Sequence, residues 1–334
     1  MKPPLKISRA DLQSVLETSG TRVEYIIEHL DRFYRPKEVW SNGKLRPILA
    51  PRRELKLLQL RIARRLIIPI PLHPSAYCHI GKGALAAARL HAKHPWLLKV
   101  DLANFFPSVT ADRVRTCLRS HGATGAVLRI LSGLTTYCGS LIQGAPSSVA
   151  ISNLVLKPLD ERLAGLCQQR RGLSYTRYID DVAISGGARV RNVEALVRRI
   201  VEDDGWRVND RKSGLWGGNQ RRAYLGMVIN AEPNVDPSYV RDLRYLLHRL
   251  KRGATPLQEK QILRLRGKID YVAAVNPAKG ERLRQEFSDY LEHSLDSLAT
   301  VDPPAPIPPA APRLNELEAL QTHSREASAS GGGS

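Results

Sequence analysis

Long apolar runs are missing from this sequence of 334 residues. No stretch is long enough to span a bilayer, and residues 1–6 lack the apolar segment of a secretory signal. Cysteine is scarce, since only four residues are present and none of them forms a Cys-x-x-Cys pair. We therefore expect free thiols without a disulfide framework, no membrane partner and a cytoplasmic location.

A zinc ligand set is also missing. His73, His79, His91 and His94 lie near one another in the chain, but no cysteine or carboxylate completes a zinc-like spacing around them. Structural or RNA-contacting roles are therefore favoured for these histidines. Because the sequence has no internal repeat, its length favours one large functional unit over several independent domains.

Acidic residues are few relative to basic ones. The chain has 32 Asp and Glu against 51 Lys and Arg, which gives a formal net charge of +19 and a pI near 10.1. This excess favours a polyphosphate partner such as nucleic acid. It also predicts binding that weakens strongly as the salt concentration rises.

Two apolar segments of the chain end in acidic residues. Residues 178–181 read Tyr-Ile-Asp-Asp and precede an apolar stretch, which predicts a hairpin whose exposed tip carries Asp180 and Asp181. A strand is predicted over residues 96–102, with Asp101 near its end. Carboxylates in such places are suited to divalent metal, and three of them could supply two Mg²⁺ sites for phosphoryl transfer.

Three motifs in this order resemble the palm of reverse transcriptases. Asp101 matches the first catalytic motif, residues 143–148 are similar to the Gln-Gly-x-Pro-x-Ser segment, and residues 178–181 match Tyr-x-Asp-Asp. The resemblance implies an α+β right-hand polymerase with fingers, a helical thumb and a palm whose antiparallel sheet carries the catalytic aspartates. It also implies RNA-directed DNA polymerase activity, a nucleotidyl transfer.

The same resemblance implies roles for the acidic residues. Asp101, Asp180 and Asp181 are the expected catalytic residues, and these three with Leu102 are the expected metal ligands. Two Mg²⁺ ions, for which Mn²⁺ can substitute, would neutralise the charge that develops on the reacting phosphate.

The incoming nucleotide is expected to meet the fingers. Asn-Gly at 42–43 predicts a β-hairpin, which is similar to the fingers hairpin in which Lys44 and Arg46 would contact the triphosphate. Gln143 and Gly144 are expected to frame the template base and the nucleotide.

Two further positions are implied to contact the nucleotide. Phe106 would lie beneath the sugar and exclude a 2′-hydroxyl by its shape, whereas Phe105 is expected to point the other way and pack in the core if the chain is extended there. Lys212, in an Asn-x-x-Lys segment, would lie near the triphosphate and help to protonate the pyrophosphate. An ordinary surface pair between Lys212 and Asp210 is an equally acceptable interpretation.

Primer and template contacts are expected downstream. Residues 223–230 predict a half-buried hairpin similar to the primer grip, where a glycine lets backbone approach the primer end. Helical segments over 239–252 and 263–272 resemble the thumb of bacterial retron-type reverse transcriptases, which would clamp a duplex by its phosphates. The residues expected to contact primer or template are Tyr178, Leu225, Gly226, Arg241, Arg244, Arg249 and Lys268.

Domain boundaries follow from these segments. We expect N-terminal helices and fingers over 1–95, a palm with part of the fingers over 96–235, a helical thumb over 236–300 and a disordered Pro-rich and Gly/Ser tail over 301–334. The patterns also predict a helical start capped by Ser8 or Asp11, a helix over 54–68 and a helix that ends at Gly253.

The short length, the thumb pattern and the lack of an endonuclease or maturase domain resemble bacterial retron reverse transcriptases and related defence reverse transcriptases. Two segments depart from the retron pattern, because Ala87 replaces the Asn of Asn-Ala-x-x-His and Tyr224-Leu225-Gly226 replaces Val-Thr-Gly. The resemblance implies cDNA synthesis from a cognate structured noncoding RNA in antiphage defence. Its expected partners are this RNA, an RNA–DNA duplex, dNTP substrates, and an effector protein or a second copy of the chain.

Three alternatives stay open at this point. A defence reverse transcriptase could make DNA without a template or from a short repeated one, with the same carboxylates. The chain could instead be an RNA-binding scaffold whose DNA synthesis is incidental. A mobile-intron maturase is the least supported, since the chain has little room for further domains.

Overall fold

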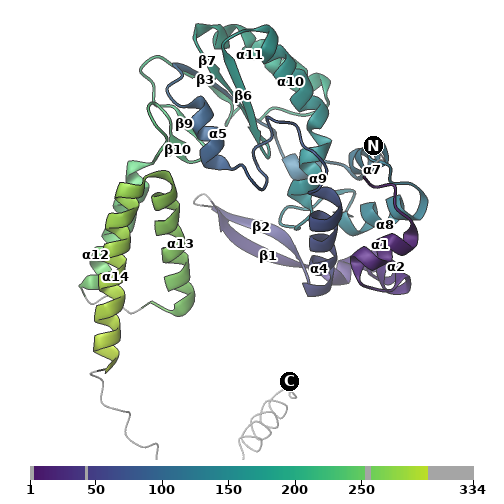
Figure 1. Ribbon diagram of the computed structural model, residues 1–334, viewed down its shortest axis with the longest axis horizontal. Helices are drawn as coiled ribbons and strands as arrows, with labels where there is room; N and C mark the ends of the chain where they lie inside the picture. Colours follow the sequence, from purple (N-terminus) through teal and green to yellow (C-terminus); the bar gives the residue numbers. More distant parts are fainter. Residues whose placement is uncertain (1–3, 42–43, 253–256, 300–334) are drawn as a thin grey trace, which may run out of the picture. The chain divides into compact units, whose positions relative to one another are not determined.

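The computed structural model of the protein describes residues 4–41, 44–252 and 257–299 (Figure 1). The chain forms two compact units. Of the described residues, the larger unit contains those up to 240 together with 274–276, and the smaller unit contains those between 241 and 273 and those from 277 onward. All three aspartates of the acidic motifs belong to the larger unit.

A four-stranded antiparallel sheet lies at the centre of the larger unit. Its strand order is β6 (Leu173–Tyr178), β7 (Asp181–Gly186), β3 (Trp96–Asp101) and β8 (Gly214–Gly217). These strands confirm the hairpin predicted at residues 178–181 and the strand predicted to reach Asp101.

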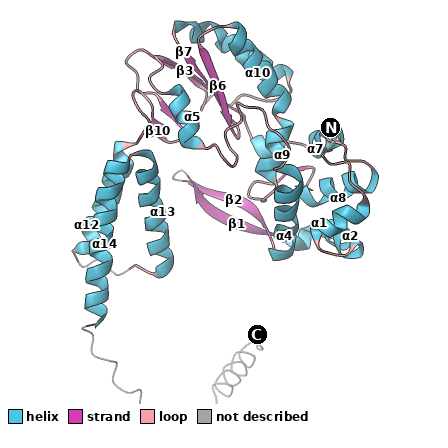
Figure 2. Ribbon diagram, viewed as in Figure 1, coloured by secondary structure: helices cyan, strands magenta, loops and turns pink. Residues whose placement is uncertain are grey.

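Both faces of the two central strands are covered. Leu97 and Leu98 point to opposite faces of β3, and both side chains are fully buried. In β7 the consecutive residues 182–185 are all buried. Helix α5 (Ala84–His91) contacts β7 as well as the edge strand β6, and α10 (Lys157–Gln169) contacts β6 (Figure 2). This double coverage explains why the acidic motifs are preceded or followed by apolar runs without polar alternation.

Helices from the start of the chain pack around α8 (Gly125–Thr135). The helices from this part of the chain that contact it are α1 (Arg9–Leu16), α2 (Gly20–Glu28) and α4 (Arg53–Arg61). Ser8 caps α1 in a capping box, since its hydroxyl accepts a hydrogen bond from Asp11 N and the Asp11 carboxylate accepts one from Ser8 N.

The helix predicted over residues 54–68 differs in its second half. There the α-helix gives way to a π-helical segment, η1 (Ile62–Ile67). In this segment Ile68 N donates to Ala63 O, five residues earlier, at 2.8 Å. Arg65 donates to Val15 O at 2.8 Å and pairs with Glu17 at 2.6 Å at the end of α1, and the sequence pattern contains no signal for the π-helical geometry.

The predicted fingers hairpin is present. Strands β1 (Tyr34–Ser41) and β2 (Lys44–Pro51) pair antiparallel, with Ser41 opposite Lys44. The two turn residues of the prediction, 42 and 43, lie outside the described residues. Pairing that closes on a two-residue connection is what the Asn-Gly pair predicts.

Short strands and connecting helices complete the larger unit. They are α3 (Leu30–Phe33), α6 (Phe105–Ser108), α7 (Ala111–Ser120), β4 (Thr136–Tyr137), β5 (Ser140–Leu141), α9 (Ser148–Val155), η2 (Ala188–Val193), α11 (Glu194–Asp203), β9 (Ala223–Tyr224), β10 (Met227–Val228) and β11 (Asn234–Val235). β9 and β10 form the hairpin predicted over 223–230, and β11 pairs with β10.

The smaller unit is helical. It comprises most of α12 (Pro237–Lys251) and α13 (Glu259–Val275) and the whole of α14 (Pro277–Ala299). Leu243, Leu247 and Leu250 are buried at helical spacing along α12. The predicted cap at Gly253 and the predicted tail at 301–334 lie outside the described residues. In the chain as described, no helix is both long and apolar enough to cross a membrane.

Candidate active site

Three carboxylates meet where β3 and β6 end and β7 begins. Asp101 lies directly opposite Asp181 in the antiparallel pairing of β3 with β7, and Tyr178 lies opposite Asp181 on the other side. Residues in such opposed positions have Cβ atoms about 4.5–5.5 Å apart, and like charges there repel. Asp180 follows in the adjoining turn, so the fold gathers the three acidic residues that the sequence predicted as catalytic.

The turn that carries Asp180 has an unusual backbone. Ile179 adopts a φ of 57°, in the left-handed region, which costs a β-branched residue roughly 1–2 kcal/mol. Two hydrogen bonds hold this turn: Arg177 Nη1 donates to Ile179 O at 3.0 Å, and Leu102 N donates to Asp180 O at 3.1 Å. Such strained conformations persist where surrounding contacts over-determine them.

Asp101 is held by the segment that contains the Asn-x-x-Lys motif. Asn209 Nδ2 donates to Asp101 Oδ1 at 2.8 Å, and Lys212 Nζ donates to Oδ2 at 2.9 Å. Asn209 N also donates to Asp101 O at 2.8 Å. Lys212 therefore pairs with Asp101, and the alternative pair with Asp210 is wrong, because Asp210 accepts a hydrogen bond from Arg198 at 2.6 Å.

The electrostatics of the cluster reflect its crowded negative charge. Burial, followed by repulsion from Asp180 and Asp101, raises the pKa of Asp181 to about 6 from 3.8. The hydrogen bond to Asp101 raises the pKa of Lys212 above its usual value. Burial lowers the pKa of Lys99, which lies two residues before Asp101 and therefore on the same face of β3.

The donor chemistry of the three aspartates fits Mg²⁺. Carboxylate oxygens are the ligands that hard divalent cations prefer, and a cation would relieve the repulsion that raises the pKa of Asp181. Within the described ranges, no group of three or more His, Cys, Asp or Glu side chains is already arranged around a common metal position. Both oxygens of Asp101 instead accept hydrogen bonds from Asn209 and Lys212. The predicted ligand set of Asp101, Leu102, Asp180 and Asp181 stays a prediction.

The predicted nucleotide residues flank this cluster on the chain. Phe106 is half-buried and packs beside Phe105, with ring centroids 5.3 Å apart. Phe105 is buried, as expected, and lies 5.9 Å from the ring of Trp206. The two residues belong to the short helix α6 and not to extended chain, because Asn104 reverses the backbone with a φ of 47°.

Gly144 brings the Gln-Gly segment next to the fingers hairpin. Its φ is +96°, and a Cβ built on it would lie 3.2 Å from Ile48 Cδ1 of β2. Gln143 is exposed. The side chains of Lys44 and Arg46 lie outside the described part of the structure, so their contact with the triphosphate stays a prediction.

Cationic side chains line a cavity beside Gly144, and of these only Lys56 lies in a segment, the helix over 54–68, that the sequence predicted. A cavity of about 680 Å³ adjoins Gly144. The basic residues that line it are Arg35, Lys37, Arg52, Arg53 and Lys56. Arg35 and Lys37 form an Arg-x-Lys stretch in β1. This stretch was a usable signal for a shared basic face, since residues two apart in a strand point to the same side.

The primer-grip segment contains a tight turn. Leu225 and Gly226 connect β9 to β10 with φ values of 49° and 79°, which is the geometry of a two-residue hairpin turn with φ above zero at both positions. Tyr178 is half-buried at the end of β6. Their contacts with primer or template stay predictions.

The two segments that depart from the retron pattern contact each other. His91 is buried, with its nitrogens 2.7 Å from Thr176 Oγ1 and 2.6 Å from Ser185 Oγ. The Tyr224 hydroxyl lies 3.2 Å from the same Thr176 oxygen, and its ring meets the His91 ring edge-on at 5.3 Å. His94 also approaches Ser185 Oγ, at 2.6 Å. His91 is therefore part of the core that supports β6 and the primer-grip turn.

The predicted thumb contacts lie on exposed helix faces. Arg241, Arg244 and Arg249 are exposed on α12, and Lys268 is exposed on α13. All four belong to the smaller unit. Their contact with primer or template stays a prediction.

Comparison with known proteins places the chain among its relatives. Residues 35–229 match the family Reverse transcriptase (RNA-dependent DNA polymerase). The chain is 35% identical over 280 residues to the Retron Mx65 reverse transcriptase of Myxococcus xanthus, covering 77% of this chain and 64% of that protein. It is 29% identical over 287 residues to the Retron Ec86 reverse transcriptase of Escherichia coli, covering 84% and 88%. The chain thus spans less than two thirds of the length of the Mx65 relative.

A solved structure of telomerase from Candida albicans, in complex with a TWJ fragment of telomeric RNA, is similar in fold. Its TM-score is 0.50 at 10% identity, covering 80% of this chain and 57% of that one. At this identity the likeness concerns the fold alone. It agrees with the α+β right-hand polymerase fold predicted from the sequence. The family match covers more than half of the chain and includes Asp101, Asp180 and Asp181, and the chain therefore belongs to the reverse transcriptase family.

Proposed function

We propose that the protein is an RNA-directed DNA polymerase, which extends a primer hydroxyl with dNTP on an RNA template. The observation that carries the proposal is the pairing of Asp101 with Asp181 across β3 and β7, with Asp180 in the adjoining turn. Family membership and the formal net charge of +19 support a nucleic acid as the partner.

Asp101, Asp180 and Asp181, with the main chain of Leu102, would hold two divalent ions, Mg²⁺ or Mn²⁺. Bound there, the ions would lower the pKa of the primer hydroxyl, which makes it a better nucleophile, and would stabilise the negative charge on the α-phosphate and the pyrophosphate. The protein itself keeps the carboxylates close together and pre-oriented. Asn209 fixes Asp101 through a side-chain and a main-chain hydrogen bond.

Lys212 would supply a mobile positive charge. Its side chain is 54% exposed although it pairs with the buried Asp101, so the ammonium can exchange this carboxylate for a phosphate oxygen without desolvation. The hydrogen bond to Asp101 raises the pKa of Lys212, so leaving Asp101 would make the ammonium a stronger acid that is still protonated at neutral pH. It can then donate a proton to the departing pyrophosphate.

The nucleotide would bind between the Gln-Gly segment and the fingers. Gln143 and Gly144 would frame the template base, and Phe106 would exclude a 2′-hydroxyl by its bulk. The cations around the cavity beside Gly144 suit a polyanionic strand or a triphosphate. Lys44 and Arg46 would contact the triphosphate, and the exposed thumb cations would contact the duplex backbone.

The biological role follows from the relatives. The Mx65 and Ec86 relatives are both named retron reverse transcriptases, which favours cDNA synthesis from a cognate structured noncoding RNA. The proposed setting is bacterial antiphage defence, with an effector protein or a second copy of the chain as a further partner.

A primer-extension assay tests the activity. Purified protein receives an RNA template, a DNA primer, dNTP and Mg²⁺, and the product is sequenced. We expect DNA complementary to the RNA, lost by at least about a hundredfold in Asp180→Ala/Asp181→Ala. The matched control is Glu202→Ala/Asp203→Ala, which removes two adjacent acidic residues from α11 and should retain synthesis.

The sequence of the product separates the alternatives. If the DNA is unrelated to the supplied RNA, the protein synthesises DNA without a template, and the proposal of templated copying fails. In cells that carry the native flanking locus, RNA and DNA bound to the protein are sequenced. Bound RNA without DNA that depends on the aspartates would favour the RNA-binding scaffold.

A further inference from the structure

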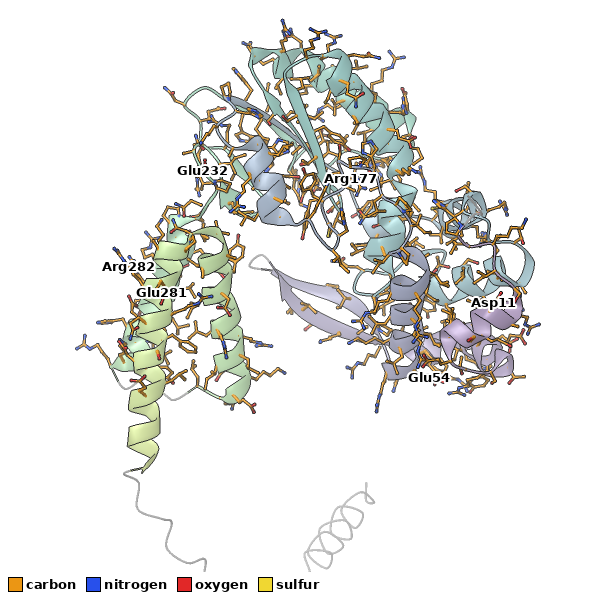
Figure 3. All side chains as sticks on the ribbon, viewed as in Figure 1. Asp11, Glu54, Arg177, Glu232, Glu281 and Arg282 are labelled. Carbon is orange, nitrogen blue, oxygen red and sulfur yellow. The ribbon has the colours of Figure 1, made fainter. Side chains whose placement is uncertain are left out.

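A buried ion pair lies directly behind the turn that carries Asp180. Arg177, near the end of β6 and labelled in Figure 3, pairs with Asp160 on α10, and both side chains are fully buried. Arg177 Nε and Nη2 donate to the two carboxylate oxygens of Asp160 at 2.8 and 2.7 Å. Buried ion pairs contribute little net stability compared with apolar packing, because both charges lose their hydration. A structural contribution alone therefore gives little reason to place the pair here.

The remaining nitrogen of Arg177 points to the turn. Nη1 donates to Ile179 O at 3.0 Å and to Asn153 Oδ1 at 2.9 Å. Ile179 O belongs to the peptide unit that leads into Asp180, so this bond fixes the plane of that peptide. On the other side, Asp180 O accepts from Leu102 N at 3.1 Å. The backbone of Asp180 is thus held from both directions.

The geometry of the turn needs such support. Ile179 has a φ of 57°, which β-branched residues avoid. Relaxation of Ile179 toward ordinary backbone angles would rotate the peptide that precedes Asp180 and redirect its carboxylate. The guanidinium prevents this, because Asp160 holds it by two parallel hydrogen bonds while Nη1 stays aligned with the turn.

The network also reaches the Gln-Gly segment. Asn153 lies on α9, whose first turn is tied to that segment by a hydrogen bond from Ser148 Oγ to Ile142 O at 2.8 Å. Asn153 Nδ2 donates to Cys78 O at 2.9 Å. One guanidinium therefore contacts both the acidic turn and the helix that follows the nucleotide-framing residues.

We propose that Arg177, anchored by Asp160 and Asn153, is a positioning residue that holds the Ile179–Asp180 peptide in the orientation needed for metal binding by Asp180. This inference rests on the proposed function. Arg177 itself is buried and would touch neither nucleotide nor metal. Its effect would pass through the backbone of the turn.

The test is Arg177→Lys, which keeps the charge that balances Asp160 but removes the planar fork. Mn²⁺ binding to the protein with primer–template is measured from the electron paramagnetic resonance of free Mn²⁺. We expect Mn²⁺ affinity and kcat to fall by about 10- to 100-fold, as for other residues that orient metal ligands. The KM for dNTP should stay within about threefold, because the nucleotide contacts are untouched.

Tyr175→Phe is the matched control. The Tyr175 hydroxyl donates to Asp160 Oδ1 at 2.6 Å, so this variant weakens the same buried network without removing the bond to Ile179. Denaturant unfolding of both variants measures the loss of stability. If Tyr175→Phe is destabilised yet binds Mn²⁺ like the wild type, the loss in Arg177→Lys is due to positioning and not to stability.

A second variant covers the case in which Arg177→Lys does not fold. Asn153→Ser keeps the ion pair and removes one of the two acceptors that align Nη1, so a smaller loss of Mn²⁺ affinity and kcat is expected. Wild-type Mn²⁺ binding in the folded Arg177 or Asn153 variant, or an equal loss in Tyr175→Phe, overturns the inference. DNA synthesis that survives Asp180→Ala/Asp181→Ala would overturn the proposed function instead, so the two failures are distinguishable.

Discussion

Lys212 Nζ and Asp101 Oδ2 lie 2.9 Å apart, although the lysine side chain is 54% exposed and the aspartate side chain only 6%. The exposed ammonium of Lys212 thus donates a hydrogen bond to a buried carboxylate of the acidic cluster. An ordinary surface pair would have both partners in water. The asymmetry indicates that the lysine can leave while the aspartate stays fixed.

Replacement of Lys212 by Met should lower kcat/KM for dNTP by about 10- to 100-fold, because the charge that is proposed to contact the triphosphate is lost. Lys212→Arg keeps the charge and should lose less. Steady-state primer extension measures both. The control is Lys93→Met, which breaks an exposed pair with Glu232 and should have no effect. Equal activity in the Lys212→Met and Lys93→Met variants would mean that Lys212 has no role in nucleotide binding or catalysis.

Asp181 should reduce the stability of the protein at neutral pH. Its pKa of about 6 in the folded protein, raised by burial and by Asp180 and Asp101, exceeds its usual 3.8. Between these values the folded state keeps a proton that the unfolded state has lost, so stability falls as the pH rises through this window. The penalty is complete about one pH unit above the folded pKa and amounts to on the order of 1–3 kcal/mol.

Asp181→Asn should therefore be more stable than the wild type at pH 7, and this gain should vanish near pH 3.5. Guanidinium unfolding in the presence of EDTA at the two pH values measures the difference. A gain of equal size at both values would mean that the charge of Asp181 is not its cause. The variant should at the same time lose DNA synthesis, since function is the reason for keeping an unfavourable charge.

Local patterns predicted the strands and turns of the site well. Asp101, Asp180 and Asp181 occur where apolar runs end, and strand ends at a common edge bring such residues together. The β1–β2 hairpin likewise follows from its Asn-Gly pair, and the β9–β10 hairpin lies within the hairpin predicted over 223–230.

Residues that act through long-range contacts were not predicted. Arg177 bonds to Asp160 and Asn153, which lie 17 and 24 positions away, and no local period brings such partners together. A charged residue inside the buried strand β6 was the one available signal. Asn209 was visible in its motif, but its hydrogen bonds to Asp101 depend on how two distant segments pair.

His91 should make the protein sensitive to acid. Burial lowers its pKa to about 3 from 6.5, so the folded state keeps it neutral while the unfolded state gains a proton below pH 6.5. Stability should then fall as the pH drops, by roughly 2 kcal/mol at pH 5. This sign is opposite to that of Asp181.

His91→Gln tests this expectation, because glutamine stays neutral at every relevant pH. The variant should be less stable at pH 7, since hydrogen bonds to Thr176 and Ser185 are altered. Its stability should nevertheless decline less between pH 7 and pH 5 than that of the wild type. His248→Gln, which removes an exposed histidine, is the matched control. If the stability of the wild type, His91→Gln and His248→Gln declines equally between pH 7 and pH 5, His91 is not the source of the sensitivity to acid.

Gly144 should be needed for its small size as well as for its backbone angle. Its φ is +96°, and an added Cβ would lie 3.2 Å from Ile48 Cδ1 on the fingers hairpin. Gly172 has a similar φ of +87°, but nothing lies within 4 Å of the position that an added Cβ would occupy there. The two glycines therefore separate backbone strain from contact.

Gly144→Ala and Gly172→Ala should each lower the free energy of unfolding by on the order of 1–2 kcal/mol, because alanine resists a positive φ. Only Gly144→Ala should also lower kcat/KM for dNTP, by about tenfold, since its methyl group displaces the hairpin that is proposed to hold the triphosphate. Ile48→Val removes the Cδ1 atom that the new methyl group would meet. Adding Ile48→Val to Gly144→Ala should thus recover activity without recovering the stability lost to φ, because the substitution relieves the contact and leaves the backbone strain in place.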